Sequence, residues 1–165
     1  MALAAAGTAW AQGTMSVDIS VSRSVQSQGL LAAAGDYVRY EITVTNSGRS
    51  EIADQSLWVR LASEGGRTNS QASFSVPDLE PGQSAQIHAG PFKTLEAGQH
   101  FLYLGINSHG SPDAPDGVST NLSAGTPADS FLVYSPALAT ALPVGAGLAA
   151  AGAVIISVIF FRRKR

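Results

Sequence analysis

The chain has 165 residues, only 13% of them charged, and its formal net charge at pH 7 is −2. This sparse charge gives no electrostatic footprint for nucleic acid. The sequence has no cysteine, which excludes disulfides, thiolate zinc sites and cysteine nucleophiles, so a folded domain depends on its own apolar core.

The first segment, residues 1–13, is short and mostly apolar. Ala9-Trp10-Ala11 has the small-x-small form of a signal-peptidase site, and the residues before it are similar to an apolar signal core. A positively charged start is missing. We interpret the segment as a truncated signal peptide, with a short unprocessed tail as the alternative.

Between this segment and the C-terminal region, apolar residues alternate with polar ones. A period of two is typical of strands with one face toward a core, and turn residues such as Asn46-Ser47-Gly48 and Glu80-Pro81-Gly82 separate the runs. The pattern predicts that residues 15–134 form an all-β, Ig-like antiparallel sandwich of about seven strands. The expected strands lie near 17–21, 38–44, 57–61, 74–76, 85–89, 102–106 and 131–134.

A family resemblance supports this fold. The segment Gly35-Asp36-Tyr37-Val38-Arg39-Tyr40-Glu41-Ile42-Thr43-Val44-Thr45-Asn46-Ser47-Gly48 resembles the signature of prokaryotic cell-surface Ig-like repeats of the CARDB type. Residues 76–84 and 97–101 resemble two further landmarks of that family. The resemblance covers roughly residues 17–134 and implies the sandwich fold. It departs late, where such domains often carry an acidic, Asn-rich segment.

The C-terminal region predicts a membrane anchor. Residues 135–161 contain no charged side chain, and Pro143–Phe161 is apolar or small except for Ser157. As a helix, Pro143–Phe161 would span about 28 Å, close to the hydrocarbon thickness of a bilayer. We therefore expect residues 135–161 to form a linker and one transmembrane helix. The basic residues that follow should keep the C-terminus cytoplasmic: Arg162, Arg163, Lys164 and Arg165.

Small residues recur every four positions along this predicted helix. They form one stripe, and such stripes allow two helices to pack closely in lipid. The alternative is that the stripe reflects an Ala/Gly-rich composition. The residues of the stripe are Ala141, Gly145, Ala149, Ala153 and Ser157.

The residues that invite a metal or catalytic interpretation are scattered. His88, His100 and His109 stand at no ligand spacing, and no Gly-x-Ser-x-Gly elbow is present. The loop 109–117 carries Asp113 and Asp116, which could hold calcium, but a Pro-rich surface loop explains them equally well. We expect no enzyme activity, no metal and no cofactor.

Three aromatic residues are the best candidates for a partner-binding surface. If Leu57, Val59 and Leu61 face the core, Trp58 faces outward, and the same alternation puts Phe101 and Tyr103 outside. The third and sixth strands of an Ig-like sandwich are neighbours, so the three rings should share one face. The alternative is that Trp58 points inward.

These features predict a non-catalytic, single-pass protein of the cytoplasmic membrane with most of its chain outside the cytoplasm. The expected role is an accessory or scaffolding subunit of a membrane protein complex. Its partners would be membrane lipid and other subunits, contacted through the helix and the outer sheet face. The alternative role is a free-standing surface adhesion or envelope-layer module.

Overall fold

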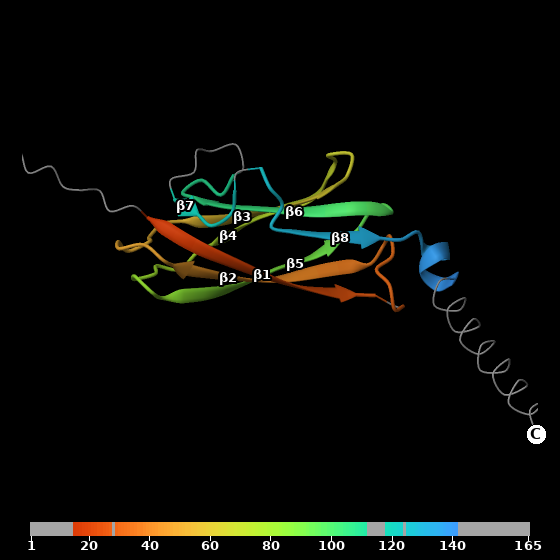
Figure 1. The fold of residues 1–165 in the computed structure, drawn as a ribbon, viewed down its shortest axis with the longest axis horizontal. Coiled ribbons are helices and arrows are strands. Elements are labelled where there is room, and N and C mark those ends of the chain that lie inside the picture. The colour runs from red at the N-terminus through yellow and green to blue at the C-terminus, as the bar shows by residue number, and fades with distance from the viewer. Residues whose placement is uncertain (1–14, 28, 112–117, 124, 142–165) are drawn as a thin grey trace, which may run out of the picture.

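The protein folds as a sandwich of two four-stranded sheets (Figure 1). The structure is a computed structural model, and it describes residues 15–27, 29–111, 118–123 and 125–141. One sheet has the strand order β5-β2-β1-β7 and the other β4-β3-β6-β8. The strands are β1 (Ser16–Gln26), β2 (Tyr37–Asn46), β3 (Ser56–Ser63), β4 (Thr68–Ser75), β5 (Ser84–Lys93), β6 (Gly98–Asn107), β7 (Ser119–Thr120) and β8 (Asp129–Val133). A helix, described over residues 136–141, follows β8.

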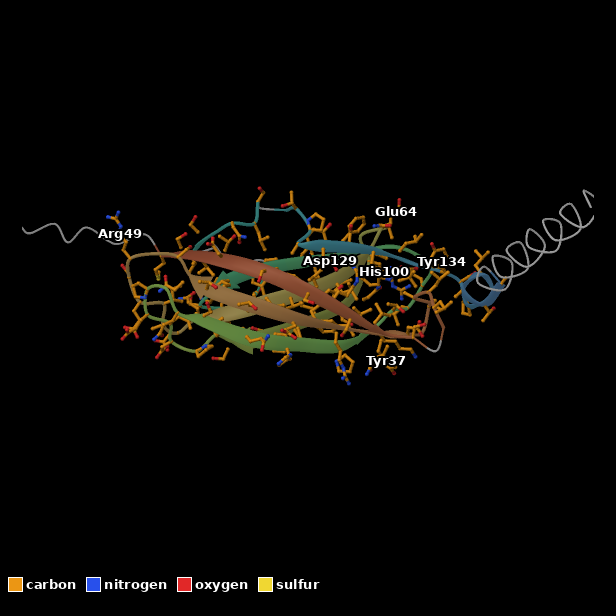
Figure 2. All side chains as sticks on the ribbon, turned by 60° about the horizontal axis from the view of Figure 1, so that its bottom comes forward. Tyr37, Arg49, Glu64, His100, Asp129 and Tyr134 are labelled. Carbon is orange, nitrogen blue, oxygen red and sulfur yellow. The ribbon has the colours of Figure 1, made fainter. Side chains whose placement is uncertain are left out.

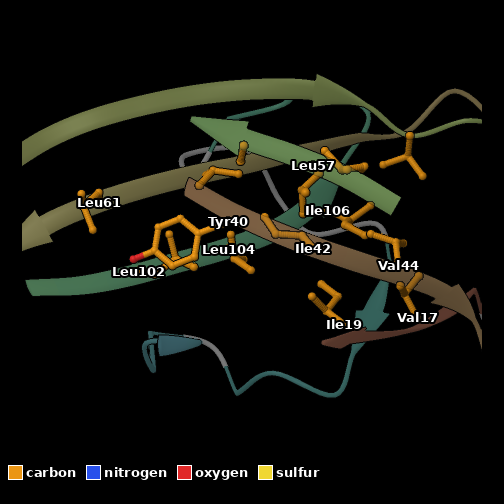
Figure 3. Packing of buried hydrophobic residues seen from close by; sticks show 14 of the residues in the cluster. Val17, Ile19, Tyr40, Ile42, Val44, Leu57, Leu61, Leu102, Leu104 and Ile106 are labelled. Carbon is orange, nitrogen blue, oxygen red and sulfur yellow. The ribbon is translucent and has the colours of Figure 1, made fainter. Parts of the chain in front are cut away.

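The core lies between the sheets and is built by the alternating strands (Figure 3). In β2, Ile42 and Val44 are fully buried, whereas Glu41 is exposed and Thr43 half-buried on the opposite side. β2 thus sends every second side chain inward. The largest apolar side chains that β3 and β6 bury completely are Leu57, Leu61, Leu102 and Ile106.

The predicted all-β sandwich is confirmed, and β3 pairs with β6 as expected for the third and sixth strands. Two elements differ from the expectation. β4 begins at Thr68, six residues before the predicted short strand at Phe74, because its first half is polar and lies at a sheet edge where alternation is weak. The two-residue β7 pairs in parallel with the start of β1 and had no sequence signal.

The two ends of the sandwich are closed differently. At one end, the buried side chains of Asn46 and Asn107 each hold the loop that follows them through hydrogen bonds. The Asn46 Nδ2 donates to the Ser50 and Leu79 carbonyls. The Asn107 Nδ2 donates to the Ser111 carbonyl. At the other end, backbone hydrogen bonds join three connections, 32–36, 93–97 and the segment after β8. The helix 136–141 leaves from this second end (Figure 1).

The alternation predicts a sharp difference between neighbouring residues in β2. Ile42→Ala should destabilise the fold by about 2–5 kcal/mol, because it leaves a cavity between the sheets. Thr43→Ala, one residue away on the outer face, should have little effect. Chemical denaturation of both variants measures the difference, and similar free energies of unfolding would contradict the observed register.

Candidate functional site

The outer face of the β4-β3-β6-β8 sheet carries three aromatic side chains. The apolar residues that alternate with them in β3 and β6 are buried, so Trp58, Phe101 and Tyr103 point away from the core. The register sets Trp58 opposite Gly105 and Arg60 opposite Tyr103. The structure therefore places the three rings on one outer face, as the alternation predicted, while their role in docking stays a prediction. We call Trp58, Arg60, Phe101 and Tyr103 the aromatic face.

The side chains of the aromatic face lie against the sheet. A Cβ atom at Gly105 would stand 2.5 Å from three atoms of the Trp58 indole, so the ring occupies the space that only a glycine leaves free. The Arg60 guanidinium carbon lies 4.8 Å from the centroid of the Tyr103 ring, a cation–π contact. All three aromatic residues are half-buried. Trp58 and Tyr103 therefore already have packing contacts on this face.

The outer face of the other sheet has a different character. Apart from Tyr37 at the first residue of β2, its outward residues are polar, and several are charged and exposed. Glu41 accepts a hydrogen bond from the Gln86 amide, and the hydroxyls of Thr45 and Ser84 lie 2.8 Å apart. This face is typical of a solvated sheet surface. Its outward-facing residues on the three long strands are Asp18, Ser20, Ser22, Ser24, Gln26, Tyr37, Arg39, Glu41, Thr43, Thr45, Ser84, Gln86, His88 and Lys93.

An ion pair joins the two sheets at their β1/β8 side. Arg23 is paired with the buried Tyr40, so its side chain starts from the inner face of β1. Its Nη1 donates to the Asp129 Oδ2 at 2.6 Å and to the Ser130 carbonyl at 3.1 Å. The guanidinium also lies 4.7 Å from the centroid of the Phe131 ring. Sequence reasoning missed this contact, although the alternation of β1 places Arg23 inward.

Polar groups extend from this ion pair into the core. The Tyr40 hydroxyl and the His100 Nε2 are buried, and within the described ranges neither atom has a partner at full hydrogen-bond geometry, although the Arg23 side chain lies close enough to the Tyr40 hydroxyl to lower its pKa. Burial raises the pKa of Tyr40 far above its ordinary value, and the negative charge of Asp129 raises it further, outweighing the opposite effect of Arg23. The Tyr40 hydroxyl is therefore kept neutral in the folded protein.

The three histidines lie apart. His88 is exposed on β5, as its alternation predicted, and His109 is exposed after β6. His100, expected at the start of a strand, is the third residue of β6, is fully buried, and packs on Phe131 with 5.5 Å between ring centroids. Across the residues that the structure describes, no group of three or more metal-ligating side chains comes together. The two aspartates of the loop 109–117 lie outside the described residues.

Asn121, which opens a glycosylation sequon by sequence, has a structural role. Its Oδ1 accepts a hydrogen bond from the Ile19 N–H at 2.8 Å, and its Nδ2 donates to the Ile19 carbonyl at 3.1 Å. The side chain thus continues the short β7 strand along the edge of β1. This bond pattern satisfies backbone groups that a sheet edge otherwise leaves open.

Most of the predicted anchor lies outside the described residues. Ala141, the first residue of the small-residue stripe, is the last described residue of the helix that follows β8 and is exposed. Gly145, Ala149, Ala153, Ser157 and the basic residues 162–165 belong to the part that is not described. Among the described segments, no helix has the length and apolar character needed to cross a bilayer.

Comparison with known proteins finds solved structures that are distantly similar to this chain. No protein-family model matches the chain. No curated protein matches it either. Several solved structures resemble it at low identity. The ApaA protein of Bordetella pertussis is 16% identical over 74% of this chain and 96% of its own, with a TM-score of 0.44.

Two further structures have similar values. The C-terminal domain of wzt is 12% identical over 69% of this chain and 77% of its own, with a TM-score of 0.44. A CARDB domain from Pyrococcus furiosus, solved in complex with di-metal ions, is 14% identical over 74% and 88%, with a TM-score of 0.39. Because these scores are below 0.5, the class of this protein is defined by its own sheet order, a sandwich of two four-stranded sheets.

The unpartnered Tyr40 hydroxyl predicts a pH-dependent effect. Because the folded-state pKa of Tyr40 lies above the unfolded-state value of tyrosine, about 10, the unfolded chain loses this proton first, and the stability of the fold decreases as the pH rises above about 10. Tyr40→Phe should be neutral or slightly stabilising at pH 7, because it removes a buried polar group without a partner. It should also reduce the loss of stability above pH 10.

Urea denaturation of the wild type and Tyr40→Phe at several pH values measures both effects. Tyr103→Phe, which removes a hydroxyl from the outer face, is the control for the substitution itself. A clear destabilisation of Tyr40→Phe at neutral pH would mean that the hydroxyl is hydrogen-bonded after all.

Proposed function

We propose that the protein is a CARDB-type surface domain with a C-terminal membrane anchor that serves as a non-catalytic accessory or scaffolding subunit of a membrane protein complex. Its sandwich lies outside the cytoplasm and binds a neighbouring subunit through the aromatic face. The observation that carries this proposal is the contrast between the two outer sheet faces, of which one is polar with a single ring, Tyr37, at one end, and the other bears Trp58, Phe101 and Tyr103 on its two central strands.

Aromatic side chains on an outer sheet face favour a protein partner. Trp, Tyr and Arg are the residues that most often dominate binding energy at interfaces, and Trp and Tyr bury a large area while losing few rotamers. On this face, Trp58 already rests on Gly105 and Arg60 on Tyr103. Docking then costs little additional side-chain entropy.

The chemistry of the partner surface follows from the same residues. Arg60 is the only charged residue among the outward positions of β3 and β6 within the described chain. A partner that covers the rings would present apolar side chains, with a carboxylate or carbonyl oxygen opposite the Arg60 guanidinium. An uncompensated buried guanidinium would oppose binding.

The membrane location rests on the sequence of the tail. Pro143–Phe161 is long enough to cross a bilayer, and the basic residues after it orient the span. The small-residue stripe gives this helix a surface for a second helix in lipid. Two contacts, one in the membrane and one outside it, suit a subunit of an assembly.

Replacing Trp58 tests the proposal. In the full-length protein, Trp58→Ala should remove the partner from complexes extracted in mild detergent, because it deletes the largest ring of the aromatic face. The sandwich should still unfold cooperatively, with a melting temperature lowered by no more than about 5 °C, since the side chain is only half-buried. Native mass spectrometry and circular dichroism provide the two measurements.

His88→Ala is the matched control, because His88 is an exposed ring on the opposite outer face. This variant should keep the partner. If Trp58→Ala prevents folding, Phe101→Ala takes its place as the test. Retention of every partner after replacement of Phe101 would mean that this face does not dock.

A further inference from the structure

The large apolar side chains that the sandwich exposes are concentrated at one end. Within the described residues, five such side chains are 43–86% exposed. They belong to separate elements, namely the β1–β2 connection, the start of β2, the β5–β6 connection, β8 and the helix 136–141. The five residues are Leu30, Tyr37, Leu95, Leu132 and Leu138.

The strand register brings these elements together. Tyr37 pairs with Gln26 at the last residue of β1 and with Lys93 at the last residue of β5, so the Leu30 and Leu95 connections leave from the same end. Leu132 pairs with Gln99, the second residue of β6, and so lies next to that end. Backbone hydrogen bonds of Ala34 with Tyr134 and of Gly35 with Thr94 join the connections directly. We call this the helix end of the sandwich (Figure 2).

The helix end also includes the charged β3–β4 turn with Glu64 and Arg67, but the opposite end, where Arg49 is labelled in Figure 2, exposes no large apolar side chain among the described residues. Its connections 47–55 and 77–83 expose charged residues, including Arg49, Glu51 and Asp78. The larger aliphatic side chains there, Ile52 and Leu79, are buried and join the core. The difference between the ends is therefore not a general property of the loops.

We infer that the helix end of the sandwich rests on the surface of the lipid bilayer, with Leu30, Leu95 and Leu138 inserted into its interfacial layer. This inference rests on the proposed membrane anchor. The described helix ends at residue 141, and the predicted span begins at Pro143. Two Cα–Cα steps cover at most about 7.6 Å, so an anchored chain keeps this end next to the bilayer.

A lipid surface also fits the chemistry of the residues. Leucine side chains gain free energy when they leave water, and tyrosine places its ring at the level of the lipid headgroups while its hydroxyl stays hydrated. Several side chains from separate connections would contact the bilayer at once. The contact would hold the sandwich in one orientation and leave its long faces, including the aromatic face, pointing along the membrane toward neighbouring proteins.

The test uses the full-length protein in vesicles of phosphatidylcholine and phosphatidylglycerol. The chain has no cysteine, so single cysteines can each carry an environment-sensitive fluorophore. Leu30→Cys and Leu95→Cys label the helix end. Arg49→Cys and Asp78→Cys label the opposite end as matched exposed controls, and Ala149→Cys labels the predicted span.

Probes at residues 30 and 95 should be blue-shifted and quenched several-fold more strongly by nitroxide-labelled lipid than by aqueous iodide. Probes at residues 49 and 78 should show the reverse. Iodide quenching at residues 30 and 95 together with lipid quenching at residue 149 would overturn the inference and leave the anchor standing. Iodide quenching at residue 149 would overturn the anchor and the inference together. Protection of residues 30 and 95 from both quenchers would mean that protein, such as a second copy of the chain, covers this end.

Discussion

Packing between the inward-facing side chains of β2, β3 and β6 holds the two sheets together, and the other surfaces of the protein take their positions from it. Ile42, Leu57 and Ile106 are fully buried between the sheets. Because successive side chains of a strand point to opposite faces, burial of Leu57 forces Trp58 outward. A register shift of one residue would bury Arg60 and expose Leu61, which the free energy of burial opposes.

The same core explains why the sandwich needs a separate closure at its β1/β8 side. β7 covers only the first two residues of β1, and the Asn121 side chain covers Ile19. Farther along β1, the Arg23–Asp129 ion pair crosses to the other sheet. Since Arg23 also stacks on Phe131, it is held more firmly than an ordinary exposed ion pair. A long sheet edge thereby gains a charged side chain that disfavours strand pairing with other molecules.

The sequence was informative where alternation was regular. It predicted the inward faces of β2, β3 and β6, and with them the outward positions of Trp58, Phe101 and Tyr103. It did not reveal the first half of β4, because a polar edge strand has no apolar period. It also missed the inward position of Arg23, a charged residue at the end of an apolar run. The apolar helix end could not be predicted, since Leu30, Leu95 and Leu138 meet only through the strand register.

The sandwich has three distinct surfaces. They are the polar outer face of the β5-β2-β1-β7 sheet, the aromatic face, and the helix end with its exposed apolar side chains. In the proposed arrangement, the helix end meets lipid, the aromatic face meets a protein, and the outer face of the β5-β2-β1-β7 sheet meets water. A contact with lipid would support a contact with protein, because a sandwich fixed on the bilayer would present its side to other membrane proteins. An orientation fixed in this way reduces the rotational freedom lost on docking.

Site-specific photo-crosslinking in intact membranes tests the central claim most directly. A photoreactive phenylalanine analogue replaces Phe101 on the aromatic face, or His88 on the outer face of the β5-β2-β1-β7 sheet, in the full-length protein. The account predicts one protein adduct of defined mass from position 101, lost when Trp58 is also replaced by alanine, and none from position 88. The same adducts from both positions, or no protein adduct from position 101, would contradict it.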